Sequence, residues 1–268
     1  MKIKIIWYNI RNGFSKEQTP FIQRQSCKKA VSKLLNKENP DILVLGEAFF
    51  WSFAKTEKIK DYNKFFDKLY RIYAPAEKSF KHSPILISKF KINYYKDKSK
   101  YHKQFLQTKM QTGEKEISID TIHPSPQLSK KENMKFLKRV TKGKNGNYIL
   151  VGDFNVASPE DKYDKKKLIK NFEEFLGKKA KSTVDKILDK KTVNTILKND
   201  LIDTYKFLNK DFDFTIPTDD LSKDKSTGIR MDYIFCSNDF KILESGIIKN
   251  EFSEKGSDHY PIYAILEI

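Results

Sequence analysis

Hydrophobic residues gather in short runs that alternate with polar stretches along this chain. Continuous or alternating apolar runs of four to ten residues are typical of strands, and those without polar interruption suit a buried sheet. The stretch 83–123 shows several such runs separated by polar breaks. Beyond it, strands are predicted at residues 3–8, 41–47, 147–153, 226–237 and 260–268.

Other segments carry apolar residues at helical spacing. Val31, Leu34 and Leu35 predict a helix that follows Pro20 and ends before Pro40. An apolar stripe predicts a second helix over residues 61–73, and a third is predicted over 131–140.

The order of these elements favours a single α/β domain spanning residues 1–268, with sheets covered by helices. The chain shows no repeats, no Gly/Ser linker and no low-complexity tract. Residues 160–200 are rich in lysine and helical in pattern, and we interpret them as a surface elaboration of that domain.

The net positive charge of the chain adds an indication of its binding partner. The 268 residues carry a formal net charge of +17, which favours polyanions such as nucleic acid. Only five of the 52 basic residues are arginine, whose guanidinium group binds phosphate with better geometry than the lysine amino group does. A lysine excess also fits a solvated surface, so a binding footprint and a solvated face both remain open.

The remaining composition indicates a reduced, cytoplasmic setting. Cys27 and Cys236 make no disulfide framework and are expected to be buried. The N-terminal stretch is too short and polar for a signal peptide, and no apolar run approaches the roughly 20 residues of a membrane span. Nothing demands an oligomer, so a monomer is expected.

Polar residues that could take part in catalysis follow the ends of the apolar runs. Each alone is an ordinary turn residue, but sheet enzymes collect catalytic groups at strand ends. Carboxylates suit Mg²⁺, a histidine beside aspartates is an oriented base, and asparagine donates to phosphate oxygens. No zinc-type spacing or Gly-rich phosphate loop is present. The set favours metal-assisted phosphoester hydrolysis. It comprises Asn9, Glu47, His123, Asp153, Asn155, Asp258 and His259.

The ordered series "WYNIRNG", "PDILVLGE", "IDTIHPSP", "GDFN", "DFTIPT", "IRMDYIF" and "GSDHYPI" resembles the endonuclease/exonuclease/phosphatase superfamily. The match extends from residue 7 to 263. It implies a four-layer α/β sandwich, with two mixed β-sheets face to face, helices outside, and the site at one edge between the sheets.

The resemblance also implies roles. Glu47 would bind Mg²⁺, with Mn²⁺ a possible substitute, while Asp258 would assist on the metal side. Asn9 would touch metal-bound water or phosphate. Asp153 and Asn155 would hold the nucleophile and a phosphate oxygen.

Two histidines complete the implied site. Asp232 would accept a hydrogen bond from His259, which would polarise the attacking water or bind the phosphate; the division between His259 and Asp153 stays open. His123 would donate to a phosphate oxygen. A strand residue at Asp232 and a turn residue at His123 are the structural alternatives. The family often has Gln before the metal-binding Glu, where this chain has Gly46.

Three functions are compatible with these residues. The first is a Mg²⁺-dependent nuclease that hydrolyses DNA or RNA with an activated water. The second is a phosphatase or phosphodiesterase for a small-molecule or lipid phosphoester. The third is a binding module without activity, against which the retention of every acidic and histidine position argues.

Overall fold

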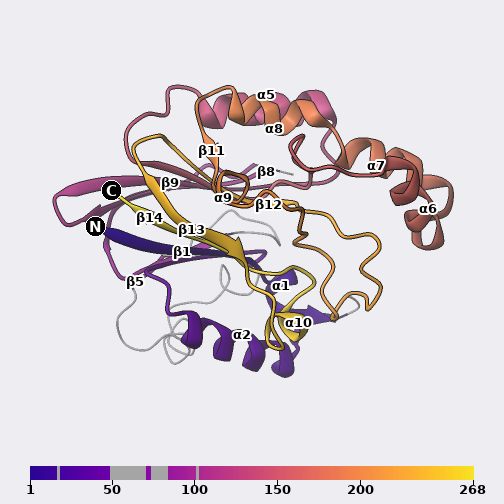
Figure 1. Ribbon diagram of the computed structural model, residues 1–268. Coiled ribbons are helices and arrows are strands. Elements are labelled where there is room, and N and C mark those ends of the chain that lie inside the picture. The colour runs from indigo at the N-terminus through magenta and orange to yellow at the C-terminus, as the bar shows by residue number, and fades with distance from the viewer. Residues whose placement is uncertain (17–18, 49–70, 74–83, 101–102) are drawn as a thin grey trace.

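The computed structural model describes residues 1–16, 19–48, 71–73, 84–100 and 103–268. Within these ranges the strands form two six-stranded mixed sheets, which lie face to face with helices outside (Figure 1). The four-layer α/β sandwich expected from the resemblance is therefore confirmed. Among the helices of these ranges, none combines the length and apolar character that a bilayer crossing requires.

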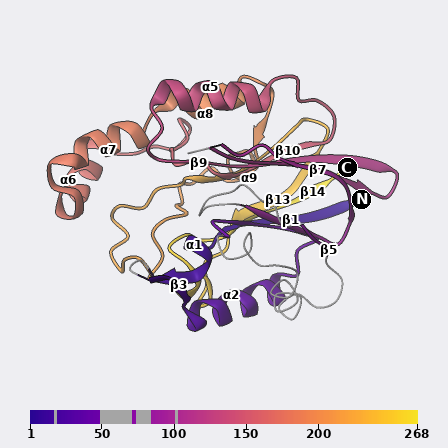
Figure 2. The same cartoon turned by 180° about the vertical axis from the view of Figure 1, so that it is seen from behind.

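The first sheet holds both ends of the chain, which lie side by side in Figures 1 and 2. Its centre is β1, which runs parallel to β4 and antiparallel to β14. The order across the sheet is β13 (Lys241–Ile247), β14 (Ile262–Glu267), β1 (Lys2–Asn9), β4 (Ile42–Gly46), β6 (Ile85–Ser88) and β5 (Arg71–Tyr73).

The second sheet repeats this plan, with one parallel pair, β9 and β10, among antiparallel neighbours. A separate small hairpin joins β2 (Ser15–Lys16) to β3 (Thr19–Gln23). The order across the second sheet is β11 (Ile202–Asp203), β12 (Asp232–Cys236), β10 (Tyr148–Asp153), β9 (Lys115–Pro124), β8 (Lys103–Thr112) and β7 (Lys91–Asp97).

The alternation of side chains along β1 explains why it is buried on both faces. Ile3, Ile5 and Trp7 join the core between the sheets, whereas Ile6 and Tyr8 pack with α2 on the outer face. Helix α2 (Gln25–Glu38) ends before Pro40, as the sequence predicts, and its C-cap residue Asn39 adopts a left-handed conformation. A second outer core lies beneath α5 (Lys130–Thr141) and α8 (Lys190–Leu197).

The remaining helices are short or peripheral. In Figure 1, α6 and α7 project beyond one end of the sheets. These elements are α1 (Arg11–Phe14), α6 (Lys165–Leu176), the 3₁₀ turn η1 (Gly177–Lys179), α7 (Ala180–Ile187), α9 (Thr204–Leu208) and α10 (Ser253–Gly256).

Three predicted elements differ from the structure. The helix predicted over 61–73 is wrong at its end, because residues 71–73 pair with β6 as a strand; residues 61–70 lie outside the described ranges. Pro20 itself lies in strand β3, and the α2 helix begins only at Gln25. The strand predicted over 226–237 begins at Asp232, because the Thr215 hydroxyl accepts from the backbone N–H groups of Met231 and Asp232 before the ladder starts.

Candidate functional site

The topology brings the chemistry-bearing residues to one edge of the sandwich. The parallel pairs β1/β4 and β9/β10 end at this edge, and their antiparallel partners β14 and β12 begin there. The directions of the strands thus place residues from six separated segments together, on strand ends or in the loops next to them. They are Asn9, Glu47, His123, Asp153, Asn155, Asp232, Asp258 and His259.

His259 is held by Asp232 across the space between the sheets. The His259 Nδ1 lies 2.8 Å from the Asp232 Oδ2, and both side chains are buried. This contact leaves Nε2 facing the Asp153 Oδ2, at 3.9 Å. Burial alone would lower the pKa of His259, but the charge of Asp232, with smaller contributions from Asp153 and Asp258, raises the pKa well above its ordinary value. The arrangement therefore favours an imidazolium ion in the metal-free protein.

Asp153 is a buried carboxylate with its two oxygens in different environments. Its Oδ1 accepts the backbone N–H of Asn155 at 2.8 Å. Its Oδ2 accepts from the Asn9 Nδ2 at 3.3 Å and lies 3.5 Å from the His123 Nε2. Burial, and next the charge of Asp232, raise the pKa of Asp153 to about 6, against the lowering effect of the two histidines.

Glu47 shares these neighbours from the opposite sheet. Its Oε1 accepts from the same Asn9 Nδ2 at 3.1 Å and lies 3.8 Å from the His123 Nε2. Its Oε2 accepts from the backbone N–H of Asn12 at 2.9 Å. The carboxylates of Glu47 and Asp153 therefore face one small space between an amide and an imidazole.

The backbone around Glu47 is unusual. Glu47 has a φ of 54°, and all four residues of α1 have positive φ, which makes this element a left-handed turn. Such a conformation is costly for residues other than glycine and is concentrated at functional sites. Here it aims the Asn12 N–H at the glutamate.

Asn155 and Asp258 stand at the two flanks of this space. The Asn155 Nδ2 donates to the Pro124 carbonyl at 3.0 Å. The Asp258 Oδ1 accepts from the Ser257 hydroxyl at 3.1 Å, and its Oδ2 lies 3.5 Å from the Arg11 Nε. Burial raises the pKa of Asp258, with His259 lowering it and the charge of Glu47 raising it.

The donor set fits a hard divalent cation. One ligand atom each from Asp153, Asp232 and His259 lies within 4.8 Å of the others. Glu47 and Asp153 add two oxygens that converge on Asn9, at 3.1 and 3.3 Å from its Nδ2. Oxygen donors of this kind suit a hard divalent cation.

Trp7 belongs to the site, although its sequence position indicates only a core residue. Its Nε1 donates to the Asp232 Oδ1 at 2.6 Å, so the carboxylate that holds His259 is itself held from the other sheet. The ring fills the space beside Gly46, where an added Cβ would lie 2.4 Å from the Trp7 Cη2. This contact gives a physical reason for the glycine before Glu47.

The structure thus brings together seven of the eight residues listed above through direct or shared contacts, with Asp258 tied instead to Arg11. His82 and His102, the other two histidines, lie outside the described residues.

Comparison with known proteins identifies this arrangement. A family model described as the endonuclease/exonuclease/phosphatase family matches residues 6–259. No curated protein sequence matches the chain significantly.

Solved structures share the fold at low sequence identity. TDP2 from D. rerio, complexed with a single-strand DNA product, aligns with a TM-score of 0.64 at 14% identity and covers 100% of this chain and 99% of its own. An AP endonuclease from Archaeoglobus fulgidus gives 0.67 at 17% identity, covering 99% and 100%. A mannosyl-6-phosphatase from Bacteroides thetaiotaomicron gives 0.64 at 17%, also covering 99% and 100%. This chain belongs to the endonuclease/exonuclease/phosphatase family, whose members hydrolyse phosphoric esters.

Proposed function

We propose that this protein is a divalent-metal-dependent phosphodiesterase that hydrolyses nucleic acid with an activated water. The observation that carries the proposal is the convergence of His259, Asp153 and Glu47 on one space at the strand ends. It contains an acid–base pair, a carboxylate for a metal and amide donors for phosphate oxygens, which is a complete set for this reaction.

Glu47 is the principal metal ligand in this proposal. Asp153 faces the same space, and Asp258 and Asn9 lie on the same side. Asn9 acts by fixing the two carboxylates, since its Nδ2 donates to both while its Oδ1 accepts the Arg11 N–H at 3.0 Å. When bound there, Mg²⁺ or Mn²⁺ supplies Lewis-acid polarisation of the phosphate and eases deprotonation of water.

Asp153 and His259 divide the proton chemistry. Asp153, with its Oδ2 open toward the shared space, accepts the proton of the attacking water. His259, oriented through Nδ1 by Asp232, presents its Nε2 to a phosphate oxygen. His123 and Asn155 donate to the other phosphate oxygens as negative charge develops on them.

Nucleic acid is the substrate that the charge of the chain supports best. A formal net charge of +17 attracts a polyanion far more strongly than a small phosphoester. Two structures that share the fold are a TDP2 with a DNA product and an AP endonuclease. The mannosyl-6-phosphatase of the same fold supports the alternative, a small-molecule or lipid phosphoester. Cytoplasmic location and a monomeric state remain predictions.

A substrate panel tests the proposal. Wild type and His259→Ala are compared on single- and double-stranded DNA, abasic DNA, RNA, inositol phosphates and sphingomyelin, each with Mg²⁺, Mn²⁺ or EDTA. Asp224→Asn, a fully exposed carboxylate, is the matched control. We expect metal-dependent cleavage of a nucleic acid that the control retains and His259→Ala loses. Cleavage of only the small or lipid substrates would refute the nuclease assignment and support the alternative.

A further inference from the structure

A basic trough lies on the outer face of the second sheet, outside the site described above. One hollow of about 720 Å³ opens between the end of β7 and the C-terminal part of α5. A second hollow of about 630 Å³ opens between α5 and α8. Both are lined by Lys142 and Gly143, so they meet just beyond the C-terminal end of α5, and we call the two hollows together the basic trough.

The trough concentrates positive charge. Asp97 is the only acidic residue that lines it, within the described part of the chain. The first hollow is lined by Lys96, Lys98, Lys100, Arg139, Lys142 and Lys144. The second adds Lys138, Lys191 and Lys198.

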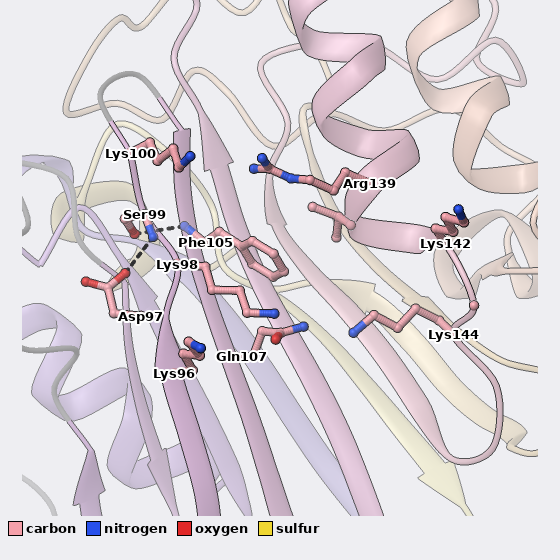
Figure 3. A pocket seen from close by; sticks show the side chains of 12 residues that line it. Lys96, Asp97, Lys98, Ser99, Lys100, Phe105, Gln107, Arg139, Lys142 and Lys144 are labelled. Carbon is pink, nitrogen blue, oxygen red and sulfur yellow. Dashed lines mark hydrogen bonds between the residues drawn. The ribbon is translucent and has the colours of Figure 1, made fainter.

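Two of these cations lie over aromatic rings. Lys98 lies over the ring of Phe105 at 5.7 Å from its centroid, and Lys144 lies over Tyr148 at 5.0 Å. Figure 3 shows the amino groups of Lys98 and Lys144 pointing toward one another across Gln107. The buried Asp120 offsets only Lys144, at 2.7 Å. The other cations that line the trough together attract an anion placed among them.

One end of the trough lies near the catalytic edge. The backbone of Lys100 forms an isolated β-bridge with Lys103. Lys103 in turn pairs in register with Pro124, the residue after His123. Gln107, on the floor of the first hollow, lies four residues further along β8, a distance of about 13 Å at the usual strand rise. A nucleic-acid strand that leaves the catalytic space past His123 would therefore reach the lysines that line the trough.

The shape and lining of the trough fit a phosphodiester backbone rather than a membrane. A membrane-binding surface combines cations with exposed apolar side chains that insert between lipids. None of the large hydrophobic residues exposed in the described ranges lines either hollow. A concave, lysine-lined channel matches the electrostatic binding of a nucleic-acid chain.

We propose that the basic trough binds the backbone of the nucleic acid beyond the point of cleavage, through sequence-independent contacts with phosphates. The inference rests on the proposed function for its substrate class. It adds a second binding surface, which would favour long substrates over short ones without entering the chemistry.

The test is equilibrium binding of a labelled DNA duplex in EDTA, measured by anisotropy over a salt series. Lys98, Lys138 and Lys142, all exposed, are changed together to Glu. The control changes Lys2, Lys115 and Lys241 to Glu; these are also exposed and lie outside the trough, so both variants have equal net charge. A Lys→Gln version of the trough variant is the alternative if the Glu version does not fold.

We expect the trough variant to bind at least tenfold more weakly at low salt. The slope of log K against log salt should fall by about two to three, since each lost phosphate contact contributes about 0.9 on a duplex. The control should change affinity less than threefold. Equal weakening of both variants would overturn the proposal by showing a general charge effect. Loss of binding to vesicles of anionic lipid, with unchanged DNA binding, would overturn it in favour of a membrane surface.

The outcome separates this inference from the proposed function. DNA binding through the trough without cleavage of any substrate would sustain the trough and refute the nuclease. Cleavage of long DNA at the same rate by wild type and the trough variant, under subsaturating conditions, would sustain the nuclease and refute the trough.

Discussion

The charge on Asp153 destabilises the metal-free protein, and Asp153→Asn should remove this cost. Burial and the neighbouring Asp232 raise the pKa of Asp153 from 3.8 to about 6. One pKa unit corresponds to about 1.4 kcal/mol, so the ionised carboxylate lowers the free energy of unfolding by about 3 kcal/mol. The proposed mechanism requires the same charge, so Asp153 lowers the stability of the fold while it supports activity.

The sign of the pH dependence follows from linkage. The folded state keeps the proton of Asp153 to higher pH than the unfolded state does. The stability that the folded protein has with Asp153 protonated is therefore fully present below the unfolded pKa. It is lost as the pH rises through the folded pKa. With these values, about 1 kcal/mol is lost by about pH 4.5 and about 3 kcal/mol by about pH 8. The variant lacks this titration.

The assay is urea unfolding of wild type and Asp153→Asn in EDTA, followed by tryptophan fluorescence from about pH 4.5 to about pH 8. The stability of the variant relative to wild type should rise by about 2 kcal/mol across this range. Costs that do not depend on pH, such as an altered hydrogen bond to Asn9, cancel in this difference. Asp224→Asn, on a fully exposed carboxylate, should show no comparable rise.

A relative stability that is the same at both ends of the pH range would refute the reasoning, because Asp153 would then titrate as an ordinary carboxylate. Magnesium in place of EDTA provides an independent check with the same unfolding assay. It should stabilise wild type at neutral pH more than it stabilises the variant, since the carboxylate faces the proposed metal position.

Three other substitutions probe the same cluster. Glu47→Gln should abolish the Mg²⁺-induced rise in thermal stability, which for a saturating ion at about 100 times Kd is about 2.7 kcal/mol in wild type; an unchanged shift would place the metal elsewhere. Asp232→Asn should lower kcat about 10²- to 10⁴-fold at constant fold, because the single amide oxygen cannot accept from both the Trp7 Nε1 and the His259 Nδ1; activity within threefold of wild type would contradict that role. Trp7→Phe removes the donor to Asp232 and should lower kcat about tenfold with unchanged KM, or about 1.4 kcal/mol; a change confined to KM would show that the indole acts on binding instead.

The strand-end residues could be predicted from the sequence because their positions follow from local pattern. A polar residue directly after a buried run, as at Glu47 or Asp153, is visible in the sequence itself. The ordered motifs then supply the long-range information that brings these ends to one edge. Backbone pairing in the structure, such as Asp153 opposite Asp232, agrees with that expectation.

Other features depend on contacts that no local pattern encodes. Trp7 occupies an alternate apolar position of β1, so it has the pattern of a core residue, and its partner Asp232 lies 225 residues away. Gly46 has meaning only beside that indole. Arg71 to Tyr73 are in a strand because β6 offers an edge for pairing, which overrides the helical spacing before them.

The basic trough illustrates the same limit for charge. Its lysines come from the end of β7, from α5 and the turn after it, and from α8. In a chain with 52 basic residues these lysines have no distinctive spacing. Only the folded arrangement shows that they line one depression while most carboxylates lie elsewhere.

The central claim is that the cluster at the strand ends uses a metal ion and a water molecule to break a phosphodiester bond. The most direct measurement is single-turnover cleavage of the nucleic acid found in the panel, in water labelled with a heavy oxygen isotope. We predict that one labelled oxygen enters the phosphate of the product, and that EDTA or Asp153→Asn stops the reaction. Cleavage that continues in EDTA, or a product phosphate without the label, would contradict the account.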